Sequence, residues 1–261
     1  MTRRVLVLDA AAGASGDMFA GALIGAGAAF PVVREHVLGL GVARLDVRVG
    51  PVVRGGVAAS RFEVFDPATG RAVDQGDAAD RGEPHRGLGA ILSLLRAGQL
   101  PTAVRVAAAA VFERLAAAEA EVHGVSVEAV HFHEVGALDA IADVVAGASA
   151  LWQLGVEQVV CSPVHVGCGT VRCAHGNLPV PAPATAALLR GVPAYSDGTS
   201  GELCTPTGAA LLRQFCHRFG PAPELLIEAE GCGAGSRELP IPNVLRATVG
   251  QVGPGVFASA R

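Results

Sequence analysis

The chain has 261 residues, enough to bury one large core or two small ones without disulfides or a structural metal. Its formal net charge of −4 argues against nucleic acid and anionic membrane surfaces as partners. All 20 basic residues are arginines, which excludes lysine as a nucleophile, a Schiff-base former or a phosphate-loop cation.

Apolar periodicity and turn residues predict strands and helices that alternate along most of the chain. The first half is expected to form a strand over residues 4–9, a small-residue turn over 10–16, helices over 18–27 and 31–40, a hairpin over 43–65 that turns at Gly55 and Gly56, a polar mobile loop over about 66–84, and helices over 88–97 and 101–123. The second half is expected to form a helix over 139–154, strands over 158–166 and 170–173, a short helix ending at 190, a helix from 205 or 206, and strands over 225–229 and 243–249. This order predicts an α/β or α+β fold, with mixed sheets packed against helices in one main domain over 1–250 and a tail over 251–261.

The start of the chain shows neither a signal peptide nor an apolar run long enough for a membrane helix. The six cysteines all lie in the second half and form no CxxC pair, so they are expected to be reduced thiols. A cytoplasmic location is therefore expected.

The turn after the first predicted strand is a candidate phosphate site. It contains Asp9, Gly13, Ser15, Gly16 and Asp17, and backbone N–H groups at the following helix start can receive an anion. The alternative is a tight turn in which Ser15 caps the helix and the aspartates are solvated. No GK[ST] follows, so this is not a Walker loop.

A second candidate is the pair formed by Glu119 and His123. The two residues are four apart in a predicted helix, so they share a face and can ligate one ion. The alternative, favoured on this pattern alone, is an exposed charge pair near a helix C-terminus.

The sharpest signal lies between residues 131 and 143. In an extended segment His131 and His133 point to the same face, Glu134 follows them, and Asp139 and Asp143 lie one turn apart on the next predicted helix. Imidazole with carboxylate suits Zn, Ni, Fe or Mn better than Mg or Ca. The alternative is a pair of core histidines beside an acidic helix start.

Two later segments carry weaker signals. His175 lies where a predicted strand gives way to a proline-rich loop, and Cys168 and Cys173 could be thiolate ligands, but we favour an interpretation in which they are buried apolar residues. Thr205 is expected to cap a helix whose start, including Thr207, is a candidate anion seat.

Together these segments resemble the LarC-type nickel-insertion proteins of nickel-pincer cofactor biosynthesis. The matching motifs follow the family's order across nearly the whole chain: GASGDM at 13–18, HRGL at 85–88, AEAEVHG at 118–124, VHFHEVGALDAIADVVA at 130–146, AHGNLPVPAPAT at 174–185, ELCTPTGAALL at 202–212 and GCGAGSRELPIPNVLR at 231–246.

The resemblance implies a nickel chelatase that inserts Ni(II) into pyridinium-3,5-bisthiocarboxylic acid mononucleotide, for lactate racemase and related enzymes. It implies a CTP-dependent reaction and a need for His131, His133 and Glu134 in turnover. The metal ligands are then expected among His131, His133, Asp139, Asp143, Glu119 and His123. The substrate and its phosphate are expected to meet Asp9, Gly13, Ser15, Gly16, Asp17, His175, Thr205 and Thr207.

Two departures from the family's pattern stand out. The loop after the early hairpin carries only His85 where many members have a histidine-rich stretch, so nickel storage there is not expected. The family's C-terminal domain, linked to CTP with Mg or Mn, does not follow residue 246, and we expect a separately encoded polypeptide to supply it.

Two other functions fit the residues: a nickel-binding carrier without catalysis, and a metal-dependent phosphoester hydrolase. The alanine-rich helices over 101–123 and 139–154 also offer surfaces for a possible homo-oligomer.

Overall fold

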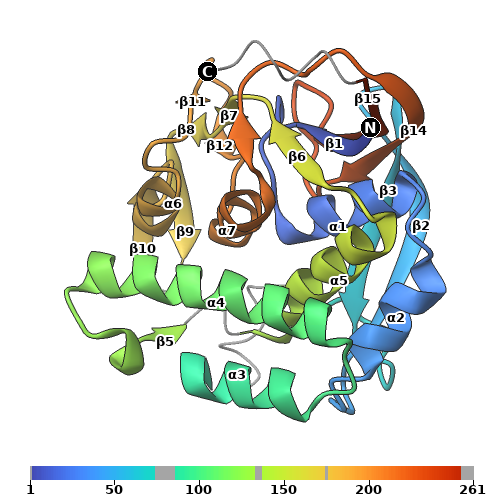
Figure 1. Cartoon of the computed structure of the whole chain (residues 1–261). Coiled ribbons are helices and arrows are strands. Elements are labelled where there is room, and N and C mark those ends of the chain that lie inside the picture. Colours follow the sequence, from blue (N-terminus) through green and yellow to red (C-terminus); the bar gives the residue numbers. More distant parts are fainter. Residues whose placement is uncertain (1, 74–85, 133–136, 174–175, 254–261) are drawn as a thin grey trace.

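The computed structural model describes residues 2–73, 86–132, 137–173 and 176–253, apart from the side chain of His131. A seven-stranded mixed sheet runs through it (Figure 1). At its centre β1 (Arg3–Asp9) pairs antiparallel with β15 (Val244–Val252) and parallel with β6 (Gln158–Cys161). The sheet continues past β15 with β14 (Leu226–Ala234), β3 (Val57–Phe65) and β2 (Asp46–Arg54), and past β6 with β13 (Arg218–Phe219). The expected fold class is confirmed.

Helices cover one face of this sheet in two layers (Figure 1). The inner layer consists of α1 (Gly16–Gly25), α2 (Phe30–Leu38) and α5 (Leu138–Leu154), and its apolar side chains meet Leu6 and Leu8 of β1 in the main core. Further helices pack beyond it: α3 (Leu88–Ala97), α4 (Thr102–His123), the 3₁₀ turn η2 (Val127–Ala129), α6 (Pro183–Leu188) and α7 (Pro206–Phe215).

Short strand pairs connect these layers. They are β4 (Arg86–Gly87) with β5 (His131–Phe132), β7 (Val164–His165) with β11 (Ala194–Tyr195), β8 (Gly167–Cys168) with β12 (Gly201–Glu202), and β9 (Thr170–Cys173) with β10 (Gly176–Pro179). Through them the chain between β6 and α7 lies beside the start of α1 and the end of α4.

Helix α1 lies unusually close to β14 because two glycines of that strand face it. A Cβ atom on Gly233 would come within 1.8 Å of the Met18 carbonyl oxygen, and one on Gly231 within 2.2 Å of the Ala26 nitrogen. No side chain fits at either position. The glycines therefore fix the depth at which the start of α1 sits against the sheet.

Several expected boundaries are corrected. The strand expected over 158–166 breaks into β6 and β7 at Ser162 and Pro163, since proline lacks the N–H that a central strand needs. The strand β15 reaches Val252, two residues into the expected tail. Residues 66–73 of the expected mobile loop form a turn that returns to β3, where the Val73 N–H donates to the Val64 carbonyl; residues 74–84 lie outside the described residues.

The alanines of α5 do not form the expected surface for binding a second copy of the chain. Its residues from Leu138 to Ala150 are buried within the chain, because α1, α2 and α4 pack around it. Helix α4 keeps an exposed side. No helix in the described part of the chain is long and apolar enough to cross a membrane.

Candidate functional site

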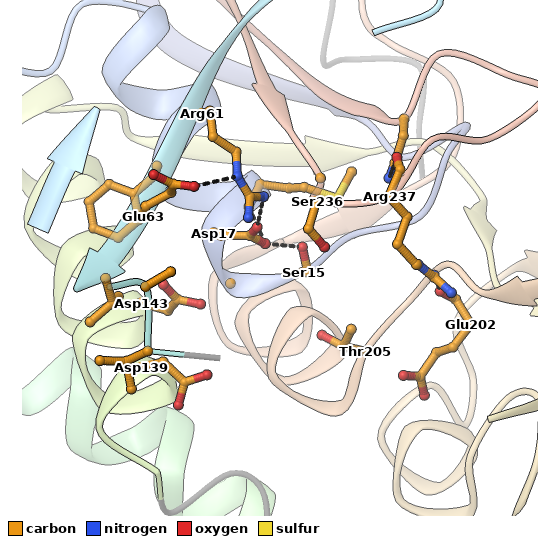
Figure 2. A pocket seen from close by; sticks show the side chains of 18 of the residues that line it. Ser15, Asp17, Arg61, Glu63, Asp139, Asp143, Glu202, Thr205, Ser236 and Arg237 are labelled. Carbon is orange, nitrogen blue, oxygen red and sulfur yellow. Dashed lines mark hydrogen bonds and ion pairs between the residues drawn. The ribbon is translucent and has the colours of Figure 1, made fainter. Parts of the chain in front are cut away.

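A cavity of about 560 Å³ opens where α1, α5 and α7 begin beside β3. Its volume is within the range of small-molecule binding sites. Figure 2 shows polar side chains converging on it from several elements. The polar and charged residues that line it are Ser15, Asp17, Arg61, Glu63, Asp139, Asp143, Glu202, Thr205, Ser236, Arg237 and Asn243.

Three carboxyl groups form one wall of this cavity. Asp139 and Asp143 lie one turn apart on α5, and both are buried. Gly16 lets the backbone of α1 approach them, since a Cβ there would lie 2.6 Å from Asp143 Oδ2. The Asp17 N–H donates a hydrogen bond to Asp143. Burial, and then the negative charges of Asp17 and Asp139, raise the pKa of Asp143 well above its usual range.

Asp143→Asn is expected to stabilise the ligand-free chain at neutral pH. With its folded-state pKa raised, ionised Asp143 costs stability as pH rises above about 4, the unfolded value. Asparagine removes this cost and can still accept the Asp17 N–H. We therefore expect the free energy of unfolding of Asp143→Asn to increase. Thermal unfolding followed by circular dichroism at pH 7.5 and near pH 4 checks this; the gain should shrink at the lower pH, and a loss at pH 7.5 would contradict it.

Two arginines also line the cavity, Arg61 beside Asp17 of the carboxyl wall and Arg237 on the other side, near Glu202 (Figure 2). Arg61 on β3 places Nη1 2.5 Å from Asp17 Oδ2 and Nε 3.7 Å from Glu63 Oε1, and it also donates to the Ala234 carbonyl at 3.2 Å. On the far side Arg237 donates to the Glu202 carbonyl oxygen. The cavity therefore has one side lined by Asp17, Asp139 and Asp143 and another where Arg237 and Glu202 meet.

Two helix starts also reach the cavity. The Thr205 hydroxyl accepts the Gly208 N–H at 3.2 Å, so the predicted cap of α7 is confirmed. Ser15 precedes α1 but does not cap it, because its hydroxyl donates to the Asp17 carboxylate instead. Both starts add partial positive charge to the cavity wall.

Three residues expected to bind phosphate lie away from this cavity. Asp9 pairs with Arg246 at 3.0 Å, because antiparallel β15 brings that arginine beside the end of β1. Gly13 has φ of 80°, and a Cβ there would lie 2.1 Å from the Leu203 carbonyl oxygen, so the backbones meet directly. Thr207 is buried in the first turn of α7. The geometry gives each of them a structural role.

Glu119 and His123 line a different, smaller cavity, where His123 Nε2 lies 3.4 Å from Glu119 Oε2. They do not share the cavity of Asp139 and Asp143. Across the described residues, no three histidine, cysteine, aspartate or glutamate side chains are grouped closely enough to hold a metal ion. The side chain of His131, together with His133, Glu134 and His175, lies outside the described residues; the backbone of His131 is extended, as expected.

Comparison with known proteins shows which family the chain belongs to. The model of the nickel insertion protein family matches residues 6–259. The chain belongs to the nickel insertion protein family. One relative, the pyridinium-3,5-bisthiocarboxylic acid mononucleotide nickel insertion protein of Desulfitobacterium hafniense strain DSM 10664 / DCB-2, is 43% identical over 94% of this chain and 58% of its own length. Proteins of the same name from Nocardioides sp. and Geobacillus kaustophilus are 48% and 40% identical, over 93% and 98% of this chain and 59% and 63% of theirs.

The chain thus spans about three fifths of the length of the relatives it matches. These comparisons give no support to the hydrolase or the carrier interpretation. No solved structure matches the chain.

Sequence reasoning missed several residues of the site. Arg237 and Asn243 lie in the GCGAGSRELPIPN segment and Glu202 begins the ELCTPTG segment, so the motifs that carry the family resemblance contain them. No motif marks Arg61, which occupies an ordinary position in the predicted hairpin. All six cysteines are free thiols, in line with the expectation of reduced cysteines.

Proposed function

We propose that this chain inserts nickel(II), as a substrate, into pyridinium-3,5-bisthiocarboxylic acid mononucleotide to form the nickel-pincer cofactor. The observation that carries the proposal is the 560 Å³ cavity, which is lined by five carboxyl groups and two arginines in a chain of the nickel insertion family. The relatives' printed names supply the substrate.

The two arginines of the cavity are the groups proposed to receive the negative charges of such a substrate. A mononucleotide with two thiocarboxylates carries negative charge at its phosphate and at both sulfur groups. Arg237 and the start of α7 at Thr205 form the proposed phosphate end. Arg61 lies beside the carboxyl wall, where it can contact a thiocarboxylate while it offsets Asp17.

Formation of a carbon–nickel bond requires a proton to leave the ring carbon. In the proposed step the C–H bond breaks, its electron pair goes to nickel, and a protein carboxylate or imidazole accepts the proton. Asp139 and Asp143 are the described groups placed for this end of the cavity. We retain His131, His133 and Glu134, which precede α5 in the sequence, as proposed catalytic and nickel-binding residues.

The remaining parts of the proposal follow from the family resemblance. CTP with Mg or Mn is proposed to act through the region that the relatives have beyond this match. A cytoplasmic location and lactate racemase-type client enzymes are proposed on the same basis.

Reconstitution tests the proposed function. The purified chain is mixed with Ni(II), the substrate mononucleotide, CTP and Mg(II), with and without a polypeptide covering the rest of a relative, and nickelated product is followed by mass spectrometry. Product in the presence of the second polypeptide is expected. Tight nickel binding without product under either condition would overturn the chelatase and favour the carrier.

Changing His131 and His133 together to alanine is expected to abolish product formation in this assay. Histidines spaced as His131 and His133 form the strongest nickel-ligand pattern in the sequence, and the change removes both proposed ligands. His217→Ala, at an exposed position beside β6, serves as the matched control. Unchanged product formation by the double variant would exclude these histidines from the reaction.

A further inference from the structure

Another cavity, of about 400 Å³, lies along the hairpin of β2 and β3 and adjoins the proposed substrate cavity. The two cavities share Arg61, Glu63 and Ser236 (Figure 2). The rest of the hairpin cavity is lined by residues 48–52 and Arg54, all in β2. In the described structure the substrate cavity does not reach these β2 residues. The hairpin cavity is therefore a separate space that the proposed function does not use.

The two cavities carry opposite charge. Five carboxyl groups and two arginines line the substrate cavity, so its lining is negative overall even when Asp143 is protonated. Three arginines and the single carboxyl group of Glu63 line the hairpin cavity, so its lining is positive. A positive cavity attracts anions, and a guanidinium group offers a phosphate two parallel N–H donors. The charge of the hairpin cavity therefore indicates an anionic ligand.

Arg54 and Arg61 are placed to receive such an anion. Arg54 Nε donates to the Gly235 carbonyl at 3.1 Å and Arg61 Nη1 donates to the Ala234 carbonyl at 3.2 Å, so neighbouring peptide groups hold both guanidinium groups in place. Their side chains are only 15% and 19% exposed. Within the part of the chain that the structure describes, neither Nη2 atom has a hydrogen-bond partner, so each can donate to a ligand.

The other charged groups near these arginines leave room for a ligand. Arg48 Nε lies 2.8 Å from Glu63 Oε2, and its guanidinium group lies over the Phe65 ring, 5.1 Å from the ring centre. We therefore place Arg48 at the rim of the cavity and not among the ligand contacts. Glu238 reaches Arg54 at 3.1 Å from a side chain that is 76% exposed, so a phosphate can displace it at little cost.

The size and the uncharged lining of the hairpin cavity indicate an organic phosphate. Its volume lies in the range of small-molecule sites and is larger than an inorganic phosphate ion fills. Val49, Pro51 and Val52 provide apolar surface, and Ser236 provides a hydroxyl group. A ligand with one phosphate group and a small organic body would contact both kinds of lining.

We propose that the hairpin cavity binds a small organic phosphate, with Arg54 and Arg61 holding its phosphate group. The substrate's own phosphate is assigned to Arg237, so the ligand of the hairpin cavity is a second molecule; this distinction rests on the proposed function. Arg61 lines both cavities and contacts Asp17 through Nη1, so the two ligands lie on either side of one arginine.

Phosphate binding is tested on the full chain without metal, by isothermal titration with ribose 5-phosphate. Ribose, which lacks the phosphate, is the ligand control and is expected not to bind. Arg54→Gln should weaken ribose 5-phosphate binding by at least about tenfold, because a charged donor to the phosphate is lost. Arg218→Gln is the matched control, since Arg218 also donates to a backbone carbonyl but lies in β13, at the opposite edge of the sheet. Equal affinities for Arg54→Gln and the natural chain, or no binding of ribose 5-phosphate, would overturn the proposal.

Glu63→Gln separates the effect of charge from damage to the fold. This change removes a negative charge from the lining, so ribose 5-phosphate is expected to bind about threefold more tightly. Damage to the hairpin would weaken binding instead, and that result would contradict the proposed charge recognition. Arg54→Lys keeps the positive charge but not the planar pair of donors, and its affinity should fall between those of Arg54→Gln and the natural chain. Thermal unfolding shows whether each variant is folded.

A competition experiment tests whether the ligand is a second molecule. The substrate mononucleotide is titrated into the chain saturated with ribose 5-phosphate, and both are expected to bind together. Competition between them would overturn the assignment to a second molecule. If the substrate does not bind the chain at all, the proposed function fails, while the ribose 5-phosphate titrations still decide whether the hairpin cavity binds phosphate.

Discussion

Replacing Arg61 by leucine is expected to reduce nickel insertion by at least about 100-fold. Arg61 is the cation that contacts Asp17 at 2.5 Å and offsets the carboxyl wall of the substrate cavity, and its side chain is only 19% exposed. Removing a charged group from a buried charge pair at a binding site costs about 2–5 kcal/mol of binding, and about 2.7 kcal/mol lost from the bound transition state corresponds to 100-fold in rate. Without Arg61 the carboxyl wall repels an anionic substrate, so substrate binding is expected to weaken as well.

Product formation by mass spectrometry and substrate affinity by titration measure this effect. Arg48→Leu is the matched control, since Arg48 pairs with Glu63 on the same hairpin but has a 51% exposed side chain and does not line the substrate cavity. We expect it to retain activity within about twofold, as loss of an exposed pair costs little. Arg61→Leu with normal affinity and rate would show that the substrate binds elsewhere.

Replacing Gly233 by alanine is expected to destabilise the fold by about 3 kcal/mol or more. The added Cβ would lie 1.8 Å from the Met18 carbonyl oxygen and 2.4 Å from the Ala22 nitrogen, both in the backbone of α1. No rotation of a side chain relieves such contacts, so α1 must move away from β14 and the core between them must open. The start of α1 would move with it, and Ser15 and Asp17 would leave their positions in the cavity.

Thermal unfolding should show a decrease in Tm of about 10 °C for Gly233→Ala. Gly50→Ala is the control because Gly50 lies in edge strand β2 with no atom within 4 Å of the added methyl group. That variant should unfold close to the temperature of the natural chain. Equal Tm values for the two variants would show that α1 and β14 accommodate extra volume.

Much of the fold could be predicted from local patterns. The helix expected over 88–97 coincides with α3, and the hairpin turns at Gly55 and Gly56 between β2 and β3, because long periodic segments and paired glycines are strong signals. The strand expected to end at 229 continues to Ala234 as β14. Gly231 and Gly233 lie beyond the predicted strand, and in the structure they provide the room that α1 needs. Two-residue strands such as β8 and β12 have no periodicity to detect.

The candidate site was predicted in part. Ser15, Gly16, Asp17, Asp139 and Asp143 were expected from two motifs far apart in the sequence, and they line one cavity. Arg61 was not expected, since a single arginine in an alternating strand is typical of a solvent-facing position. Asp9 was predicted to bind phosphate; in the structure it pairs with Arg246, a partner that the sequence does not reveal because it depends on which strand lies beside β1. Side-chain partners depend on sheet order, which local patterns do not contain.

The place of β15 in the sheet constrains how the protein is made. Strand β15 (residues 244–252) lies between β1 and β14. Because β15 is made late, β1 cannot pair with its antiparallel neighbour until this segment has been synthesised. Until then the apolar edge of β1 is paired on only one side. Because pairing between strands so distant in sequence is slow and leaves an edge exposed to aggregation, we expect β1 to be vulnerable until β15 has formed.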